Sequence, residues 1–527
     1  MTREKSVLEH AESAGSEPAA ADRHYRGYRP RPFTQEEIPH VEILFGGLHW
    51  RAERLLQAVL GNAGYRARIL PTATRDDLLT GRELADIGQC CPTSFTTGNL
   101  ANFLRHESQR IGVKEVTDHY VYVTAGSCGA CRFGQYHQSY ELALKNLGLE
   151  SFRMFLVDQK SPDQGATEGG GLDLNMPLLL GVVWAILAAD AVQSLEYRTR
   201  PYEVHPGETD ALVRESMDYL AEVYSKRPHR GGSKWGSALW HLTTGYFVRA
   251  LSKVFERFEA IEVDRLRVKP VVKITGEFYL QTVEGEPNYN IHRWLEAEGA
   301  EVYPAPIVVW LDYLLRFQVQ TLEDYVGIHR SARAKVALLK SVQRLLGWTY
   351  NRMRGALGNI PHEMPNQYEL RRLAAPYYHH RLAGGEGDML VGKALWTHQR
   401  KKAHMICELS PYACMPNTMS IGAMAAVTGH CPGLLYAPIE VKGDSEVHAL
   451  SRCQMILTEA KKRATDEFAS ALADAGITNV EEARGLMVKR PEMSRANFRI
   501  PHHGQTGMAA NSLLELAGRA RRRSAAA

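Results

Sequence analysis

The sequence lacks a long apolar run and a strong charge of either sign. Its most apolar stretch, Met176 to Ala189, has 14 residues and is followed by Asp190, whereas a helix that spans a bilayer needs roughly 18 or more. A total of 63 Lys and Arg against 59 Asp and Glu gives a net charge of +4, too small and too dispersed to indicate nucleic-acid binding. We therefore expect no membrane span and no nucleic-acid partner.

Cysteines are few, and no secretion signal opens the chain. Eight Cys among 527 residues are ordinary usage, and the first residues, MTREKSVLEHAESAGSEP, are polar instead of charged and then apolar. These features favour a cytoplasmic protein whose thiols are free or bound to a metal. The glycines of "TEGGG", Thr167 to Gly171, lack the spacing of a P-loop or a dinucleotide fingerprint.

Two segments have the apolar pattern of a β-α-β unit. The first runs from the strand-like VEILFGGL at residue 41 to YRARILP, which ends at residue 71, with an amphipathic helix between them. The second starts at VVKITGEFYL, residue 271, and ends at VYPAPIVVW, residue 310. We predict an α/β protein with two Rossmann-like or flavodoxin-like lobes, parallel sheets, a helical insert and a helical C-terminal region.

Composition and periodicity also predict the boundaries of these parts. The expected order is a mobile leader over 1–39, a first α/β lobe over 40–165, a helical insert over 166–265, a second α/β lobe with a helical segment over 266–470, and a helical region with a basic tail over 471–527. Within the second lobe, AGGEGDMLVGK at 383–393 is typical of a glycine-rich loop.

Three groups of cysteines occupy the same local context. Cys128 and Cys131 follow the strand-like HYVYVTAG and precede a helical pattern. Cys90 stands before a helix, and Cys414 follows the strand-like AHMICEL and precedes a segment that Asn417 is expected to cap. Because the turns that follow parallel strands gather at one edge of a sheet, these distant cysteines can meet.

From the residues alone, four interpretations of these cysteines stay open: an iron–sulfur cluster, inert buried thiols, a zinc site and thiol–disulfide exchange. Zinc usually takes two close pairs of ligands, and the sequence has one CxxC. Helix N-termini lower thiol pKa values and favour anions. Arg132 would add positive charge beside Cys131.

Eight segments between Gly88 and Met455 carry motifs of a known family. They read GQCCPTSFTTGNL, TAGSCGACRFGQY, YRTRPYEVHPGETDA, VKPVVKITGEFY, EGEPNYNIHRWLEAEGAEV, GGEGDMLVGK, ELSPYACMPN and VKGDSEVHALSRCQM. The chain resembles iron–sulfur proteins related to the 2-hydroxyacyl-CoA dehydratases, such as 2-hydroxyglutaryl-CoA dehydratase, and the region that accompanies their ATP-dependent CoA-enzyme activases.

The resemblance implies a ligand set. The family's Cys-x-Pro matches at Cys90, with Cys91 in the variable position; its Gly-Pro-Cys-Arg-Phe-Gly matches at Cys131 and Arg132, and its Gly-Cys-Met-Pro matches at Cys414. Two positions depart from the pattern, since Ala130 replaces a proline and Ala413 replaces a glycine.

By this resemblance, Cys90, Cys131 and Cys414 would hold a [4Fe–4S]-type cluster, with Cys128 as the candidate fourth ligand. If three cysteines bind, one iron stays open to a substrate oxygen or a water.

The resemblance also implies an activity. A low-potential cluster would pass one electron to an acyl-CoA thioester, and the ketyl radical would permit loss of a neighbouring hydroxyl, as in a lyase, or a reduction. The Asp-x-Gly-Ser-Thr loop of the activator ATPase is missing from the sequence, so electrons would come from a separate ATP-dependent partner.

Glu277, at the end of a predicted strand, is a candidate base or substrate contact. A surface or capping carboxylate is the equal alternative.

Two other functions remain as alternatives. One is a non-catalytic activator or electron carrier that serves another dehydratase, and the other is a zinc-stabilised interaction protein. A dimer is one candidate assembly.

Overall fold

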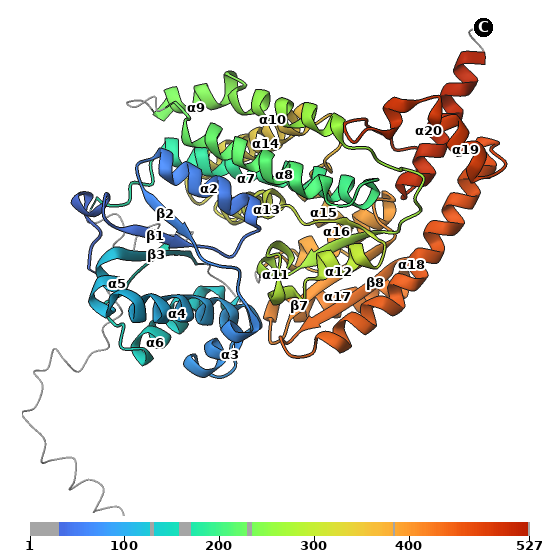
Figure 1. The fold of residues 1–527 in the computed structure, drawn as a ribbon. Helices are drawn as coiled ribbons and strands as arrows, with labels where there is room; N and C mark the ends of the chain where they lie inside the picture. The colour runs from blue at the N-terminus through green and yellow to red at the C-terminus, as the bar shows by residue number, and fades with distance from the viewer. Residues whose placement is uncertain (1–30, 127–130, 158–169, 229–233, 383–384, 525–527) are drawn as a thin grey trace, which may run out of the picture.

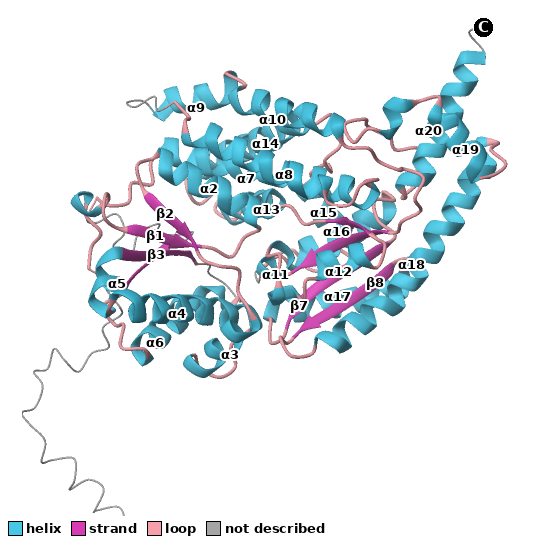
Figure 2. Cartoon of the chain, in the orientation of Figure 1, coloured by secondary structure: helices cyan, strands magenta, loops and turns pink. Residues whose placement is uncertain are grey.

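The computed structural model describes residues 31–126, 131–157, 170–228, 234–382 and 385–524. They form two four-stranded sheets and a large helical region that joins them (Figure 1, Figure 2). Every strand pairing within the two sheets is parallel, and the orders β2-β1-β3-β4 and β6-β5-β7-β8 are the same arrangement used twice. This is the flavodoxin-like order, so the predicted α/β class with two Rossmann-like lobes is confirmed.

The first sheet belongs to the segment from 42 to 157. Its strands are β1 (Glu42–Phe45), β2 (Arg66–Ile69), β3 (Tyr120–Ala125) and β4 (Arg153–Val157). Its helices are α2 (Trp50–Asn62), α3 (Arg75–Leu84), α4 (Cys91–Ile111), α5 (Val113–His119) and α6 (Tyr136–Asn146), with short 3-10 turns η2 (Gln35–Glu37) and η3 (Arg132–Gln135).

Both faces of this sheet are covered. Successive residues of a strand point to opposite faces: Ile43 packs with α2 and the long helix α7 (Met176–Thr199), whereas Leu44 packs with α4 and α6. Coverage on both sides is what an all-parallel sheet requires, because neither face is polar enough for water.

The second sheet repeats this plan between 271 and 475. Its strands are β5 (Val271–Gly276), β6 (Glu301–Tyr303), β7 (Met405–Pro411) and β8 (Leu435–Val441). Its helices are α11 (Phe278–Thr282), α12 (Ile291–Ala297), α16 (Gly387–Gln399), α17 (Met415–His430) and α18 (Glu446–Ala475), with the turn η6 (Glu286–Asn288). Cys407 of β7 packs with α12 and α18, and its neighbour Ile406 packs with α16 and α17.

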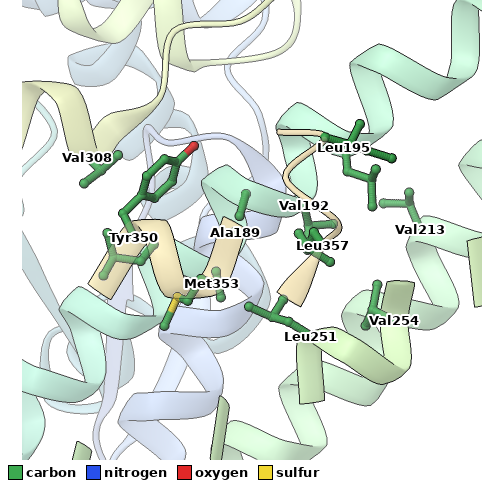
Figure 3. Packing of buried hydrophobic residues seen from close by; sticks show 14 of the residues in the cluster. Ala189, Val192, Leu195, Val213, Leu251, Val254, Val308, Tyr350, Met353 and Leu357 are labelled. Carbon is green, nitrogen blue, oxygen red and sulfur yellow. The ribbon is translucent and has the colours of Figure 1, made fainter. Parts of the chain in front are cut away.

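The joining region consists of helices that precede and follow the second β-α-β unit in the sequence. They are α7, η4 (Arg200–Tyr202), α8 (Glu208–Ser225), α9 (Lys234–Thr243), α10 (Tyr246–Arg257), η5 (Phe258–Ala260), α13 (Ile307–Glu323), α14 (Ala332–Ala356) and α15 (Gln367–Ala374), followed at the C-terminal end by α19 (Val480–Val488), η7 (Pro491–Ser494) and α20 (Met508–Ser524). Figure 3 shows their shared core, where Val192 of α7 lies among side chains of α10 and α14.

The helix α7 is the most apolar of the chain. The segment Met176–Tyr202 is long and apolar enough to cross a membrane by length and composition, but 78% of its apolar window is buried inside the protein. Core helices pass the same test, and α7 lies between α2 of the first lobe and α13 that follows β6 of the second (Figure 1).

One charged residue, Asp190, is buried in the middle of α7. Its Oδ1 lies 3.1 Å from Nε2 of His49, and its Oδ2 accepts the backbone N–H of Val308 at 2.7 Å. Because Nδ1 of His49 accepts the N–H of Ala52, Nε2 is the ring nitrogen that carries the proton and donates it to Asp190. His49 caps α2, and Val308 opens α13, so one carboxylate joins the first lobe to the second.

Several boundaries differ from the sequence expectation. Phe33, inside the expected leader, is 1% exposed and packs in the core, so the packed chain includes residues before 40. The strand expected over 302–310 ends at Tyr303 because Pro304 and Pro306 cannot donate to a ladder, and the residues after Pro306 form α13.

The segment expected as a glycine-rich loop over 383–393 is helical from Gly387 onward, as α16. Residues 278–280, expected to extend β5, begin α11. The strands β4 and β8 were not anticipated at all.

Replacing Asp190 by Ala is expected to lower the free energy of unfolding by about 3–5 kcal/mol, because it leaves the imidazole of His49 and the N–H of Val308 buried without an acceptor. Urea titration of the whole chain measures this. The matched control is Asp218→Ala, which removes a carboxylate paired with Arg54 at 3.1 Å on the surface and is expected to cost about 0–1 kcal/mol. Equal costs for the two variants would contradict the assigned role of Asp190.

Candidate active site

A cavity of about 270 Å³ lies where the carboxyl ends of the two sheets meet. Its walls come from the segments that follow β1, β3, β5 and β7, among them Gly46–Leu48, Glu277–Tyr279 and Cys414. Helix α13 closes one side through Trp310 and Phe317. The cavity therefore occupies the place where open α/β sheets bind ligands, at the carboxyl edge of the strands.

The three cysteines of the predicted set all occupy the N-cap position of a helix. Cys90 caps α4, Cys131 caps the 3-10 turn η3 that runs into α6, and Cys414 caps α17. Pro92 and Pro416 fill the first turn after two of these caps, where proline costs no hydrogen bond. The pattern Cys-x-Pro is thus a helix start whose N-cap is a thiol.

Cys131 and Cys414 line the cavity directly. Cys90 is 5% exposed, and its Sγ lies 3.2 Å from the hydroxyl of Tyr136, which itself lines the cavity, and 3.0 Å from the hydroxyl of Thr93. Cys90 also interacts electrostatically with both other thiols. Residues separated by about 40 and 280 positions in the sequence are therefore neighbours around one space.

The context of Cys90 differs from the expected one. Helix α3 lies between β2 and Cys90, so this thiol begins the second helix after its strand instead of the first. Cys91 is buried in the hydrophobic cluster of the second lobe with Phe95 and Leu78 and is not among the residues that line the cavity. Cys128 lies outside the described residues.

Cys414 is held by a short chain of hydrogen bonds. Its Sγ donates to Oδ1 of Asn417 at 3.4 Å, and Nδ2 of Asn417 donates to the buried Glu408 at 3.2 Å. The preceding residue, Ala413, has φ 62°, in the left-handed region that favours glycine. A glycine would adopt this backbone conformation without strain. Asn417 positions the thiol, and the N-cap itself is Cys414 and not Asn417 as expected.

Burial governs the chemistry of the thiols. It raises the pKa of Cys90 and of Cys414 and raises that of Cys131 to about 12, and the carboxylate of Glu277 acts in the same direction on all three. The backbone N–H groups at the helix starts, those of Thr93, Phe133 and Asn417, lower these pKa values as expected, but the effect of burial is larger. A bound metal reverses this, because a coordinating thiol loses its proton. Arg132 follows Cys131 in η3 and is half-buried.

Two carboxyl groups share the cavity with the thiols. Glu277 caps α11, accepting the N–H of Leu280 at 3.0 Å, and it lines the cavity at the same time. Glu386 also lines the cavity, is 7% exposed, and its Oε1 is buried without a hydrogen-bond partner in the described part of the chain. Burial raises the pKa of each carboxyl to about 7, and the charge of Glu386 adds to the effect on Glu277.

A buried lysine faces these carboxyl groups from α16. Lys393 is 5% exposed, interacts electrostatically with Glu386 and Glu408, and has its pKa lowered by burial to about 8.

Aromatic side chains make up much of the remaining wall. They are Tyr122, Phe133, Tyr136, Tyr140, Phe278, Tyr279, Trp310, Tyr313 and Phe317. Phe278 and Trp310 pack with ring centroids 4.5 Å apart, and Phe133 meets Tyr136 edge-on at 5.0 Å. Sequence reasoning did not identify these residues or Glu386, because they come from distant elements and no local motif marks them.

The donor set suits a cluster better than one metal ion. Among the residues that the structure describes, no group of three or more His, Cys, Asp or Glu is close enough to share a single ion. A cluster spreads its thiolate ligands over several irons, so its cysteines stand further apart. The buried thiols of Cys90 and Cys414 and the half-buried thiol of Cys131, with a carboxyl oxygen of Glu386 that has no hydrogen-bond partner in the described residues, fit such a group.

No protein-family model and no curated protein matches this chain.

Ala413→Gly is expected to leave the free energy of unfolding unchanged or raise it by up to about 1 kcal/mol, because it removes the penalty of a left-handed non-glycine residue. The control is Ala425→Gly at an exposed position inside the same helix, α17, where the change should cost about 1 kcal/mol. Thermal and urea unfolding measure both. A loss at position 413 as large as that at 425 would contradict the backbone geometry assigned to the Cys414 turn.

Proposed function

We propose that this chain holds a [4Fe–4S]-type cluster between its lobes through Cys90, Cys131 and Cys414, and acts on an acyl-CoA thioester by one-electron reduction coupled to dehydration or reduction. The observation that carries the proposal is the meeting of these three thiols, each at a helix N-cap, around one cavity. When bound, the cluster supplies a low-potential electron that side chains cannot supply.

The protein's own groups would support an anionic cluster in three ways. The N-terminal N–H groups of α4 and α17 point their positive ends toward Cys90 and Cys414. Burial excludes water and makes protonated thiols the resting form, so that ligation and deprotonation occur together. Asn417 and Glu408 hold the Cys414 turn in place.

The aromatic wall would take the acyl part of the substrate. Rings such as Trp310 and Phe317 offer apolar area and exclude water from a reactive centre. Loss of a hydroxyl group as water requires a proton, and Glu277 or Glu386, whose pKa values lie at about 7, suit a group that donates or accepts one. The carboxyl that caps α11 would thus also serve the reaction.

An external electron donor would reach the site beside Cys414. The flanking Tyr412 and Met415 are 53% and 48% exposed, so the turn that carries this thiol lies at the surface. Exposed apolar side chains beside a buried redox group are suited to contact with a partner protein. The partner proposed here is a separate ATP-dependent activator.

Anaerobic purification followed by iron and sulfide analysis tests the ligand set. Cys90→Ala, Cys131→Ala and Cys414→Ala are each expected to lose most of the iron, because each removes a thiolate ligand, whereas Cys128→Ala leaves a damaged cluster in place. The matched control is Cys431→Ala, a half-buried cysteine just after α17 that does not line the cavity. Full iron in any of the first three variants, or colourless wild-type protein with stoichiometric zinc, would sink the proposal.

Substrate binding separates an enzyme from an electron carrier. Adding a 2-hydroxyacyl-CoA thioester to the reduced protein should change the electron paramagnetic resonance spectrum of the cluster, since the acyl group would enter the same cavity, whereas free coenzyme A should not. A spectrum that stays unchanged with saturating thioester argues for the carrier.

A further inference from the structure

A second, polar pocket lies at the opposite end of the second sheet. It has a volume of about 130 Å³ and includes Val271, the first residue of β5, and Tyr303 of β6. Since the cysteine cavity begins at Glu277, just after β5 ends, a strand of six residues separates the two sites. At about 3.3 Å per residue this is roughly 20 Å, so the pocket is distinct from the proposed acyl site.

Positive charge dominates this pocket. Five cations line it, namely Arg198, Arg354, Lys401, Lys402 and Arg499, against the two carboxylates Glu301 and Glu363. They come from α7, the end of α14, the turn before β7 and the segment before α20. Elements far apart in the sequence therefore bring their positive charges to one place.

The two carboxylates leave most of this charge unpaired. Glu363 pairs with Lys402 at 3.0 Å, and Glu301 accepts the hydroxyl of Tyr202 at 2.7 Å and lies 3.7 Å from Arg198. Arg354, Lys401 and Arg499 form no ion pair within the described ranges, which leaves three cations without a carboxylate partner.

Two of the guanidinium groups are held in fixed positions by one loop. After α14, Nε of Arg354 donates to the carbonyl of Pro361 at 2.6 Å, and Nη1 of Arg198 donates to the carbonyl of Ile360 at 2.7 Å. The loop makes its turn at Asn359, whose φ is 55°. Both groups keep further N–H donors, so they are fixed before any ligand arrives and lose little freedom on binding.

One buried polar atom of this pocket has no hydrogen-bond partner among the described residues, and a bound ligand would supply one. Nε2 of His362 is buried and has no hydrogen-bond partner in the described part of the molecule, and the ring stacks on Tyr303 with centroids 3.5 Å apart. Burial and the cations Arg198 and Lys273 hold the pKa of His362 well below its ordinary value, so the ring is neutral and can donate or accept one hydrogen bond. Nε of Arg198 is likewise buried without a hydrogen-bond partner in the described residues, although it lies 3.7 Å from Oε1 of Glu301.

We propose that this pocket binds a phosphoryl anion. Arginine guanidinium groups match phosphate oxygens in pairs of hydrogen bonds, and an excess of three cations suits a group that carries two or more negative charges. The volume holds about four water molecules, which suits phosphate or diphosphate but leaves no room for a nucleoside. The anion is either free or the phosphate tail of a nucleotide whose remainder stays outside.

Isothermal titration of the full chain with inorganic phosphate, diphosphate and ADP tests the proposal. The pocket variant is Lys401→Gln with Arg499→Gln, whose side chains make no hydrogen bond or ion pair with the described residues, so folding should be unaffected. The control variant, Arg333→Gln with Lys335→Gln, removes the same charge from exposed positions on α14.

The expected result is one saturable site for diphosphate, weakened at least tenfold in the pocket variant and unchanged in the control, with affinity falling as salt rises. If ADP binds with the same affinity as diphosphate, the ligand of the pocket is the phosphate tail of a nucleotide. If only phosphate or diphosphate binds, the ligand is an inorganic anion. No saturable binding of the three probes, or the same affinity in both variants, would overturn the proposal. The titration does not depend on iron, so its failure can be distinguished from a failure of the cluster proposal.

Discussion

The buried carboxylate of Asp190 holds both walls of the cavity. It accepts from His49, which directly follows the Gly46–Leu48 wall, and from Val308, two residues before Trp310 in the opposite wall. A charge in this position is costly to bury and is tolerated because both oxygens are hydrogen-bonded. These hydrogen bonds fix the placement of the first lobe relative to the second. Cysteines from both lobes can share a site only in that placement.

A second tie between the lobes lies close by on the same helix. Arg51 of α2 contacts Glu196 of α7 and Glu284 of the second lobe, and it is 1% exposed. Together with Asp190 this makes α7 the common support of the first lobe and the second. The apolar character of α7, which resembles a membrane span by composition, follows from its burial between α2 of the first lobe, β6 of the second and the helices of the joining region.

The second lobe has different electrostatic character at its two ends. At the carboxyl end of β5, burial raises the pKa values of Cys414, Glu277 and Glu386, so their uncharged forms are favoured until a metal displaces the thiol proton. At the amino end, arginines and lysines gather with few carboxylates, which suits an anion. The parallel sheet separates the two environments by the length of a strand, so the proposed cluster and the proposed phosphoryl anion would bind at opposite ends of one lobe.

The sequence predicted those features that local patterns encode. Apolar spacing located β1, α2, β2, β5 and α12, and the sequence placed Cys90 just before a helix. It placed Cys414 before a segment capped by Asn417, whereas Cys414 is itself the N-cap. It missed β4 and β8, whose neighbours in the sheets lie far away in the sequence. The sequence did not identify Glu386 or the aromatic residues of α13 as part of the site, because only the packing of both lobes brings them to the cysteines. The glycines before α16 suggested a loop, although burial of Val391 and Ala394 in one cluster with Ile406 of β7 favours a helix.

The most direct test of the central claim is a Mössbauer spectrum of anaerobically purified protein enriched in ⁵⁷Fe. The account predicts the signal of a [4Fe–4S]-type cluster. One iron that differs from the other three would mean that Cys90, Cys131 and Cys414 are its protein ligands, and four similar irons would mean that Cys128 is the fourth. A spectrum without a cluster signal, from protein that retains its fold, would contradict it.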